Sequence, residues 1–155
     1  MQEHLYRAEL EWTGSTGDGY RSYDRRHTVR TPPAEAQLTM TSDAAFRGDP
    51  QLLNPEQLLT AAASSCQLLS FLALAARAGV DVVAYRDTAS ARMPMESSRI
   101  EEVTLRPKIT VRSPADPAAL AALVHKAHEE CYIARSLCCE VAVHPEIEVL
   151  GPAER

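Results

Sequence analysis

The stretch NPEQLLTAAASSCQLLSFLALAARAG, residues 54–79, decides the fold because it predicts one long apolar helix. Asn54 is a favourable N-cap, and Pro55 suits the first helical turn. Gln57 stands where a capping box carries Glu or Gln. Gly79 is typical of the residue that ends a helix, so we expect the helix to stop just before it.

The predicted helix is uncharged from Gln57 to Ala76, which is long enough to span a bilayer. Several polar side chains interrupt this run, namely Thr60, Ser64, Ser65, Gln67 and Ser70. No other segment resembles a membrane span. We therefore interpret the helix as the buried centre of a soluble protein, with no membrane partner. One sheet cannot cover such a helix, and a second subunit would supply the remaining packing.

Alternating apolar residues on both sides of this helix predict about six strands. These cover residues 6–12, 20–30 and 36–42 before the helix, and 82–93, 103–111 and 141–149 after it. A second helix opens at Asp116-Pro117, with apolar residues at helical spacing up to Cys131. Because helices do not alternate with every strand, the predicted class is α+β rather than α/β. Pro107 and Pro145 inside predicted strands indicate edge positions or bulges.

Length and charge narrow the possible functions. A chain of 155 residues is most simply one domain, residues 1–155. The net charge of -5 and the absence of a basic stripe argue against a nucleic-acid partner. The N-terminal MQEHLYRAEL does not resemble a secretory signal, so we expect a cytoplasmic protein. Cysteines in the cytosol are more often catalytic, redox-sensing or metal-binding than structural disulfides.

Cys66 and Cys131 each have a plain interpretation and a chemical one. Either cysteine is compatible with a small core residue, because free cysteine is among the most buried residue types. A helix dipole acts within about one turn, so it cannot activate Cys66, eleven residues after Pro55. A reactive thiolate there would need a nearby cation, and arginine is the natural one.

Two helices whose buried faces each carry a cysteine can also bring the two thiols together. Such a pair supports a two-electron peroxidase. One thiolate attacks the O–O bond and becomes a sulfenic acid, and the other condenses with it to a disulfide. An outside dithiol then resets the pair.

The sequence alone leaves the roles of two further residue patterns open. His125, His128 and Cys131 form H-x-x-H-x-x-C, which a zinc-binding protein could use. Cys138 and Cys139 are adjacent, and neighbours in a strand point to opposite faces. We interpret one of them as a core residue and the other as exposed, without an assigned role.

Three segments together resemble the OsmC/Ohr family of hydroperoxide-reducing proteins. They are the helix segment 54–80, AFRGDP at residues 45–50 and KAHEECYIARSL at residues 126–137, and the resemblance extends over nearly the whole chain. It implies sheets wrapped around a long buried central helix, in an intertwined homodimer with active sites at the subunit interface. It also implies reduction of organic hydroperoxides, in some members also hydrogen peroxide, without metal or flavin. Small dithiols or lipoylated proteins would serve as reductant.

The resemblance assigns roles to four residues. Cys66 is the attacking thiol and Cys131 its disulfide partner, while Glu56 and an arginine complete the site. YDRRH resembles a Tyr-x-Arg-x-His segment of the family, which selects Arg25, with Arg26 and Arg21 as alternatives.

Helix geometry constrains how Glu56 takes part in such a site. Glu56 and Cys66 are ten residues apart, roughly 15 Å along one helix. If both serve one site, Glu56 comes from the partner subunit or the helix is broken.

Some residues depart from the family pattern. Cys131 is followed by Tyr-Ile-Ala instead of Pro-Val-Ser, and two extra cysteines follow, which indicates an outlying branch and leaves substrate and reductant open. An apolar channel along the helix would favour organic hydroperoxides over hydrogen peroxide as substrates. The side chains that could line such a channel, or equally well pack in the core, are Leu68, Leu69, Phe71 and Leu72. The alternative function is a non-enzymatic ligand-binding protein of the same fold, with a fatty ligand as one candidate.

Overall fold

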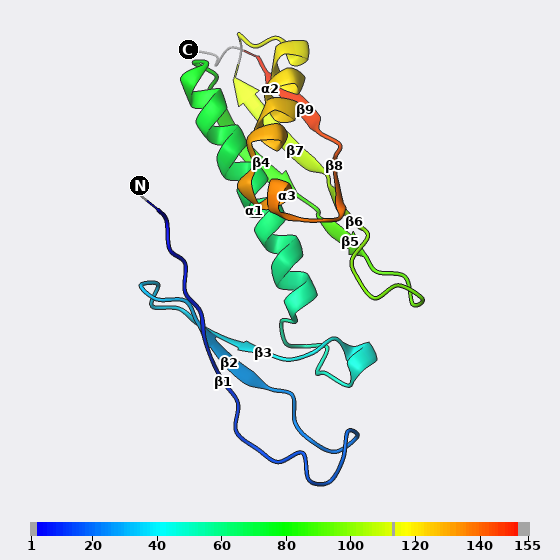
Figure 1. Cartoon of the computed structure of the whole chain (residues 1–155). Coiled ribbons are helices and arrows are strands. Elements are labelled where there is room, and N and C mark those ends of the chain that lie inside the picture. Colours follow the sequence, from blue (N-terminus) through cyan, green and yellow to red (C-terminus); the bar gives the residue numbers. More distant parts are fainter. Residues whose placement is uncertain (1–2, 113, 152–155) are drawn as a thin grey trace. The chain divides into compact units, whose positions relative to one another are not determined.

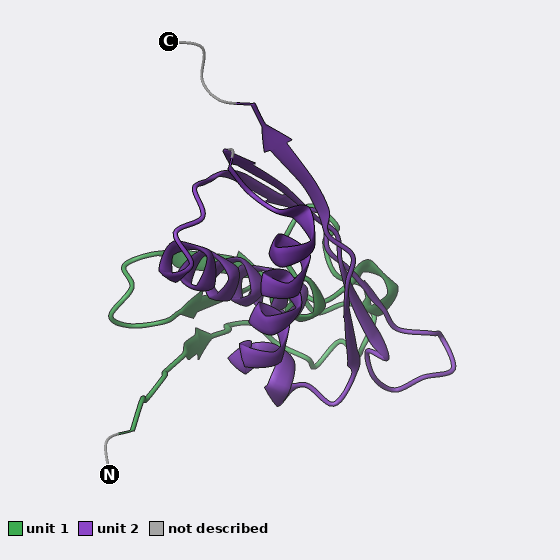
Figure 2. Ribbon diagram, turned by 90° about the horizontal axis from the view of Figure 1, so that it is seen from above, with its two compact units in different colours: residues 1–58 green, residues 59–155 purple. Residues whose placement is uncertain are grey.

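The computed structural model describes residues 3–112 and 114–151. The chain forms two compact units, unit 1 (residues 1–58) and unit 2 (residues 59–155), shown in different colours in Figure 2. Figure 1 labels the helices and strands of both units.

Unit 1 contains one antiparallel sheet in the order β1-β2-β3. The strands are β1 (Glu9–Glu11), β2 (His27–Arg30) and β3 (Gln37–Met40), followed by the short 3-10 helix η1 (Ala44–Phe46). All three strands are shorter than predicted. The predicted half-buried strand at residues 6–12 is instead exposed within this chain, with Tyr6 91% and Leu10 66% exposed. The alternating pattern is present, but the other described residues of unit 1 do not bury these side chains.

The loop after β3 leads the chain into the long helix. Gly48 lies so close to Ser42 that a Cβ atom would meet the Ser42 carbonyl oxygen at 1.6 Å, so only glycine fits there. The backbone N–H of Thr41 donates to the Leu53 carbonyl at 3.0 Å. These contacts fold the loop back onto the end of β3 and place Asn54 at the start of the helix.

The long helix α1 (Pro55–Arg77) begins and ends as predicted. Asn54 and Gln57 form the capping box, with Gln57 N–H donating to Asn54 Oδ1 at 2.8 Å and Asn54 N–H donating to Gln57 Oε1 at 3.1 Å. At the other end Gly79 has φ 72°, and Val80 N–H donates to the Ala75 carbonyl. This is the glycine-terminated Schellman arrangement.

Unit 2 contains two three-stranded sheets in which each of the last three predicted strands bends into two. Residues 82–93 become β4 (Val82–Asp87) and β5 (Ser90–Arg92), residues 103–111 become β6 (Glu102–Leu105) and β7 (Pro107–Arg112), and residues 141–149 become β8 (Glu140–Val143) and β9 (Glu146–Leu150). One sheet has the order β4-β7-β9 and the other β5-β6-β8. The described residues therefore contain nine strands, and the expectation of about six was too low because it missed these bends.

The two prolines mark the bends between consecutive strands. Pro107 is the first residue of β7, the middle strand of its sheet, where its missing N–H is tolerated. Pro145 lies between β8 and β9. The prediction of an edge position or bulge is wrong for Pro107. For Pro145 the edge position is confirmed, because β8 and β9 are both edge strands of their sheets.

The core of unit 2 lies between its helices and its sheets, as Figures 1 and 2 show. The predicted second helix is α2 (Pro117–Glu130), capped by Asp116, and a short α3 (Tyr132–Ser136) follows it. One buried cluster joins α1, α2 and β7 through Phe71, Leu74, Ala75, Ile109, Val111, Leu120, Val124 and Ala127. A second joins α1 to β6 through Ala63, Val103 and Leu105.

The helix α1 has one buried and one exposed stripe. Among the described residues it is the one helix long and apolar enough to cross a membrane, and 28% of its most apolar window is buried. The buried stripe repeats at helical spacing and packs against both sheets, with Ala63, Gln67, Phe71, Leu74 and Ala75. The exposed stripe repeats in the same way along Leu58, Ala61, Ser65, Leu69, Leu72 and Ala76. Residues of one chain thus cover one side of α1 and leave the other open.

Candidate active site

Cys66 and Cys131 come together in unit 2. Cys66 lies in the middle of α1 and is half-buried, whereas Cys131 joins α2 to α3 and is only 1% exposed. Both are free thiols in the structure, and the two side chains hydrogen-bond to each other. The Ala134 N–H donates to Cys131 Sγ at 3.5 Å, so this sulfur also caps α3. The fold thus places the two predicted redox cysteines next to each other.

The surroundings make Cys131 a poor acid. Burial, and next the hydrogen bond with Cys66, raise the pKa of the Cys131 thiol to about 11. Cys131 is therefore protonated at neutral pH. Because the thiolate is the nucleophilic form of cysteine, Cys131 is unsuited to a first attack on peroxide.

The residue after Cys66 ties the two helices together. Gln67 is fully buried, and its Nε2 donates to the Val124 carbonyl of α2 at 3.1 Å. Its Oε1 is buried without a partner among the described residues. In the sequence, Gln67 stands out only as a polar interruption of the apolar run. A long amide directly beside the candidate thiol was the signal that could have singled it out.

A carboxylate fixes α1 just before Cys66. The Ser64 hydroxyl donates to Asp87 Oδ2 at 2.6 Å, and the Arg106 backbone N–H donates to Asp87 Oδ1 at 2.6 Å. Asp87 ends β4, and Arg106 is the bend between β6 and β7. One acidic side chain thus links the helix segment before Cys66 to both sheets of unit 2.

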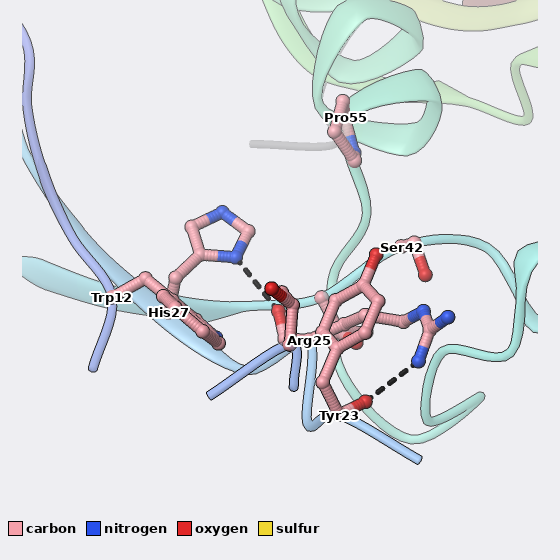
Figure 3. Close-up of a pocket in the computed structure, with 8 residues that line it drawn as sticks. Trp12, Tyr23, Arg25, His27, Ser42 and Pro55 are labelled. Carbon is pink, nitrogen blue, oxygen red and sulfur yellow. Dashed lines mark hydrogen bonds between the residues drawn. The ribbon is translucent and has the colours of Figure 1, made fainter. Parts of the chain in front are cut away.

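Arg25 lies in unit 1, against a cavity of about 350 Å³ (Figure 3). Its guanidinium group donates to the carbonyls of Tyr23 at 2.6 Å and Tyr20 at 2.5 Å. It also stacks on both rings, 3.9 Å from the Tyr23 centroid and 4.8 Å from that of Tyr20. His27 Nδ1 lies 3.0 Å from the Arg25 carbonyl. The turn that was predicted as part of a strand is therefore built around this side chain.

The two alternative arginines are placed differently. Arg26 is exposed and pairs with Asp24 at 3.0 Å. The pKa of Asp24 is lowered chiefly because the Arg26 backbone N–H donates to it. Arg21 is exposed. Among the three, Arg25 is the half-buried arginine and the one that lines the cavity.

Glu56 is half-buried in the first turn of α1. Because α1 is unbroken from Pro55 to Arg77, the possibility of a broken helix is excluded. Glu56 therefore lies roughly 15 Å along the helix from Cys66 of the same chain. A site that uses both residues needs Glu56 from a second subunit.

The zinc alternative is not supported by the structure. No group of three or more His, Cys, Asp or Glu side chains within residues 3–112 and 114–151 is placed to hold a metal ion. The reason is that α2 ends at Glu130, so Cys131 leaves the helical spacing that joined it to His125 and His128. His125 is exposed, while Cys131 is buried.

The remaining sequence candidates separate into core and surface. Cys139 packs beside the β6 cluster and Cys138 is exposed, as predicted. The side chains considered for an apolar channel do not share one environment. Phe71 is fully buried against Tyr85, whereas Leu69 is 63% exposed.

Comparisons with known proteins agree on one family. Residues 48–146 match the family described as OsmC-like protein. An OsmC-like protein of Vibrio cholerae superposes with a TM-score of 0.83 at 26% identity, over 93% of this chain and 100% of that chain. An organic hydroperoxide resistance protein of Legionella pneumophila superposes at 0.68, with 20% identity over 96% and 99%.

The likeness extends to OhrB of Bacillus subtilis, an organic hydroperoxide resistance protein, with a TM-score of 0.60 at 15% identity over 94% and 98% of the two chains. No functionally curated protein matches the sequence significantly. The expected α+β fold, with a long central helix and small mixed sheets, is thereby confirmed.

Proposed function

This chain belongs to the OsmC-like family, and we propose that it is a thiol-dependent peroxidase that reduces organic hydroperoxides. The observation that carries the proposal is the hydrogen-bonded pair of Cys66 and Cys131 in unequal surroundings. The similarity to organic hydroperoxide resistance proteins supports the same chemistry. We place its action in the cytoplasm, where a reversible thiol pair is kept in use by reductants.

The proposed reaction begins at Cys66, because its sulfur is the more accessible of the two. The Cys66 thiolate attacks the distal peroxide oxygen, the O–O bond breaks, and the substrate leaves as an alcohol after taking a proton. Cys66 is now a sulfenic acid. Cys131 condenses with it, which forms the disulfide and releases water.

Arg25 is proposed as the cation that activates Cys66, and Glu56 as the carboxylate that holds Arg25. Since α1 is continuous, the partner subunit would supply this carboxylate, so the proposal includes a homodimer. The assignment of Arg25 is supported by its position, because it is half-buried and lines a cavity. A cation within about 4–6 Å of a thiol favours the thiolate.

Thiol counting tests the reaction. Reduced protein is mixed with one equivalent of cumene hydroperoxide, and free thiols are counted in the wild type, Cys66→Ser and Cys131→Ser. We expect the wild type to lose two thiols rapidly and Cys66→Ser to lose none. Cys131→Ser should lose one, as a sulfenic acid that dimedone traps. Unchanged thiols in all three proteins would refute the peroxidase and favour the ligand-binding alternative.

The arginine assignment has a matched control. Arg25→Gln should slow thiol loss by about ten-fold or more, because it removes the cation proposed to favour the Cys66 thiolate. Arg26→Gln removes the same charge one residue away, where the side chain pairs with Asp24. Equal rates for the two variants would exclude Arg25 as the activating cation.

A further inference from the structure

Unit 2 holds a second cavity, of about 270 Å³, whose walls are charged. Its lining includes Ser70, Leu74 and Arg77 from α1, Glu130 from the end of α2, and Tyr132 and Arg135 from α3. Neither the reaction proposed above nor the resemblance to the family uses any of these side chains.

The two arginines of this cavity are without an anionic partner. Among the described residues, no ion pair and no side-chain hydrogen bond involves Arg77 or Arg135. Within the described part of the chain, Glu130 pairs with Lys126, at 3.9 Å one helical turn away. Guanidinium groups bind carboxylates in a planar, two-bonded geometry. The cavity therefore offers two groups for carboxylates and one carboxylate for a cation.

Two residues that line the cavity are close to the cysteines along the chain. Ser70 follows Cys66 by four residues, so it lies on the same side of α1, roughly 6 Å further along the axis. Tyr132 directly follows Cys131. Arg77 is eleven residues from Cys66, or roughly 16 Å along the helix. A molecule held by the arginines is thus expected to reach the thiols only if several bonds separate its carboxylate from its reactive atom.

We propose that this cavity binds the reductant, and that the reductant is a thiol of the amino-acid or short-peptide class with more carboxylates than ammonium groups. The inference rests on the proposed function, because it needs the Cys66–Cys131 disulfide as its target. A fatty anion would match the arginines but would meet Glu130 as a like charge. A neutral dithiol would use none of the three charged groups.

The chemistry of the step balances with two thiol molecules. The first, as thiolate, attacks Cys66 Sγ, because Cys131 is almost wholly buried. The disulfide breaks, Cys131 leaves and takes a proton, and a mixed disulfide remains on Cys66. A second thiolate attacks the outer sulfur of the mixed disulfide and releases the oxidised reductant. Cys66 is restored.

The test measures reduction separately from peroxide chemistry. Protein carrying Cys138→Ser, which removes the exposed thiol, is oxidised with diamide, and peptide mass spectrometry identifies the Cys66–Cys131 disulfide. Rates of thiol recovery are compared for glutathione and 2-mercaptoethanol at equal thiolate concentrations. Arg77→Gln and Arg135→Gln should each lower the ratio of these two rates by about ten-fold, the effect of losing a charge-assisted contact. The control Arg86→Gln removes an exposed charge from β4, outside the cavity.

A second pair of probes examines Glu130. Glu130→Gln should slow reduction by glutathione, which has an ammonium group, but not by N-acetylcysteine, which has none. An unchanged rate ratio in both arginine variants overturns the inference while leaving the peroxidase intact. If diamide forms the disulfide but cumene hydroperoxide does not, the proposed function fails instead. If neither oxidant forms it, both fail.

Discussion

At the scale of single residues, the two sulfur atoms differ because their neighbours differ. Cys66 lies within a helix and is half-buried, whereas Cys131 is sealed at a helix junction and has a pKa of about 11. The sequence predicted the meeting of the two cysteines through the resemblance. It could not predict their unequal acidity, because that depends on which atoms enclose each sulfur.

The raised pKa of Cys131 predicts a pH dependence of stability. The folded chain holds the Cys131 proton more tightly than the unfolded chain, whose cysteines have a pKa of about 8.5. The stabilising contribution is therefore complete below about pH 8.5 and is lost as the pH rises toward 11.

Urea unfolding of reduced protein from pH 7.5 to 10.5 measures this loss, with Cys131→Ser as the non-titrating reference. The free energy of unfolding of the wild type should fall relative to that of the variant across this range. A constant difference between the two proteins would show that Cys131 does not titrate abnormally.

At the scale of elements, α1 was predicted almost completely and the strands only in part. Local signals mark both ends of the helix, the Asn54–Gln57 capping box and Gly79, so its bounds follow from the sequence. The strands bend where the chain passes from one sheet to the other, which depends on long-range packing. The alternation of apolar and polar residues continues through these bends. Period-two patterning alone therefore cannot divide residues 103–111 into two strands. Likewise, the turn around Arg25 is held by stacking that no periodicity encodes.

The contact between α1 and α2 leads to a prediction about Gln67. Its buried Oε1 lacks a partner among the described residues, so part of the energy of its bond to Val124 is offset. Gln67→Met keeps the volume and removes the buried acceptor, and should change the free energy of unfolding by less than about 1 kcal/mol. Gln67→Ala leaves a cavity and should cost about 2 kcal/mol or more. Urea unfolding measures both, and a large loss in Gln67→Met would mean that the amide bonds are essential.

At the scale of the whole molecule, apolar surface is left open in both units. The exposed stripe of α1 includes Leu69 at 63%, and in unit 1 Leu5, Tyr6 and Leu10 are each at least 66% exposed. Apolar surface of this kind commonly marks an interface between proteins. A second copy of the chain is the expected cover, in agreement with the proposal that a partner supplies Glu56.

The dimer is tested by placing a charge in the exposed stripe. The wild-type chain has a mass of 17.0 kDa and should sediment as a dimer of twice that mass. The Leu69→Glu variant should sediment as a monomer, because the new carboxylate would be buried in the dimer interface without a partner. Ala118→Glu adds the same charge to an exposed position of α2 and serves as the control. Sedimentation velocity at several concentrations measures this. A monomeric wild type would remove the shared site.

The parallel pairs of unit 2 have a consequence for how the chain reaches its fold. Val103 pairs with Val141 and Ile109 with Ile147, so both pairs have the same offset of 38 residues (141 − 103 and 147 − 109). One ribbon thus runs through both sheets, and α2 and α3 lie between its two halves. The chain between the paired strands must close a long loop before the strands can form hydrogen bonds, and this step is slow. The last two strands, β8 and β9, are therefore expected to dock late in folding. Substitutions in β9 such as Val149→Ala should then speed unfolding far more than they slow refolding.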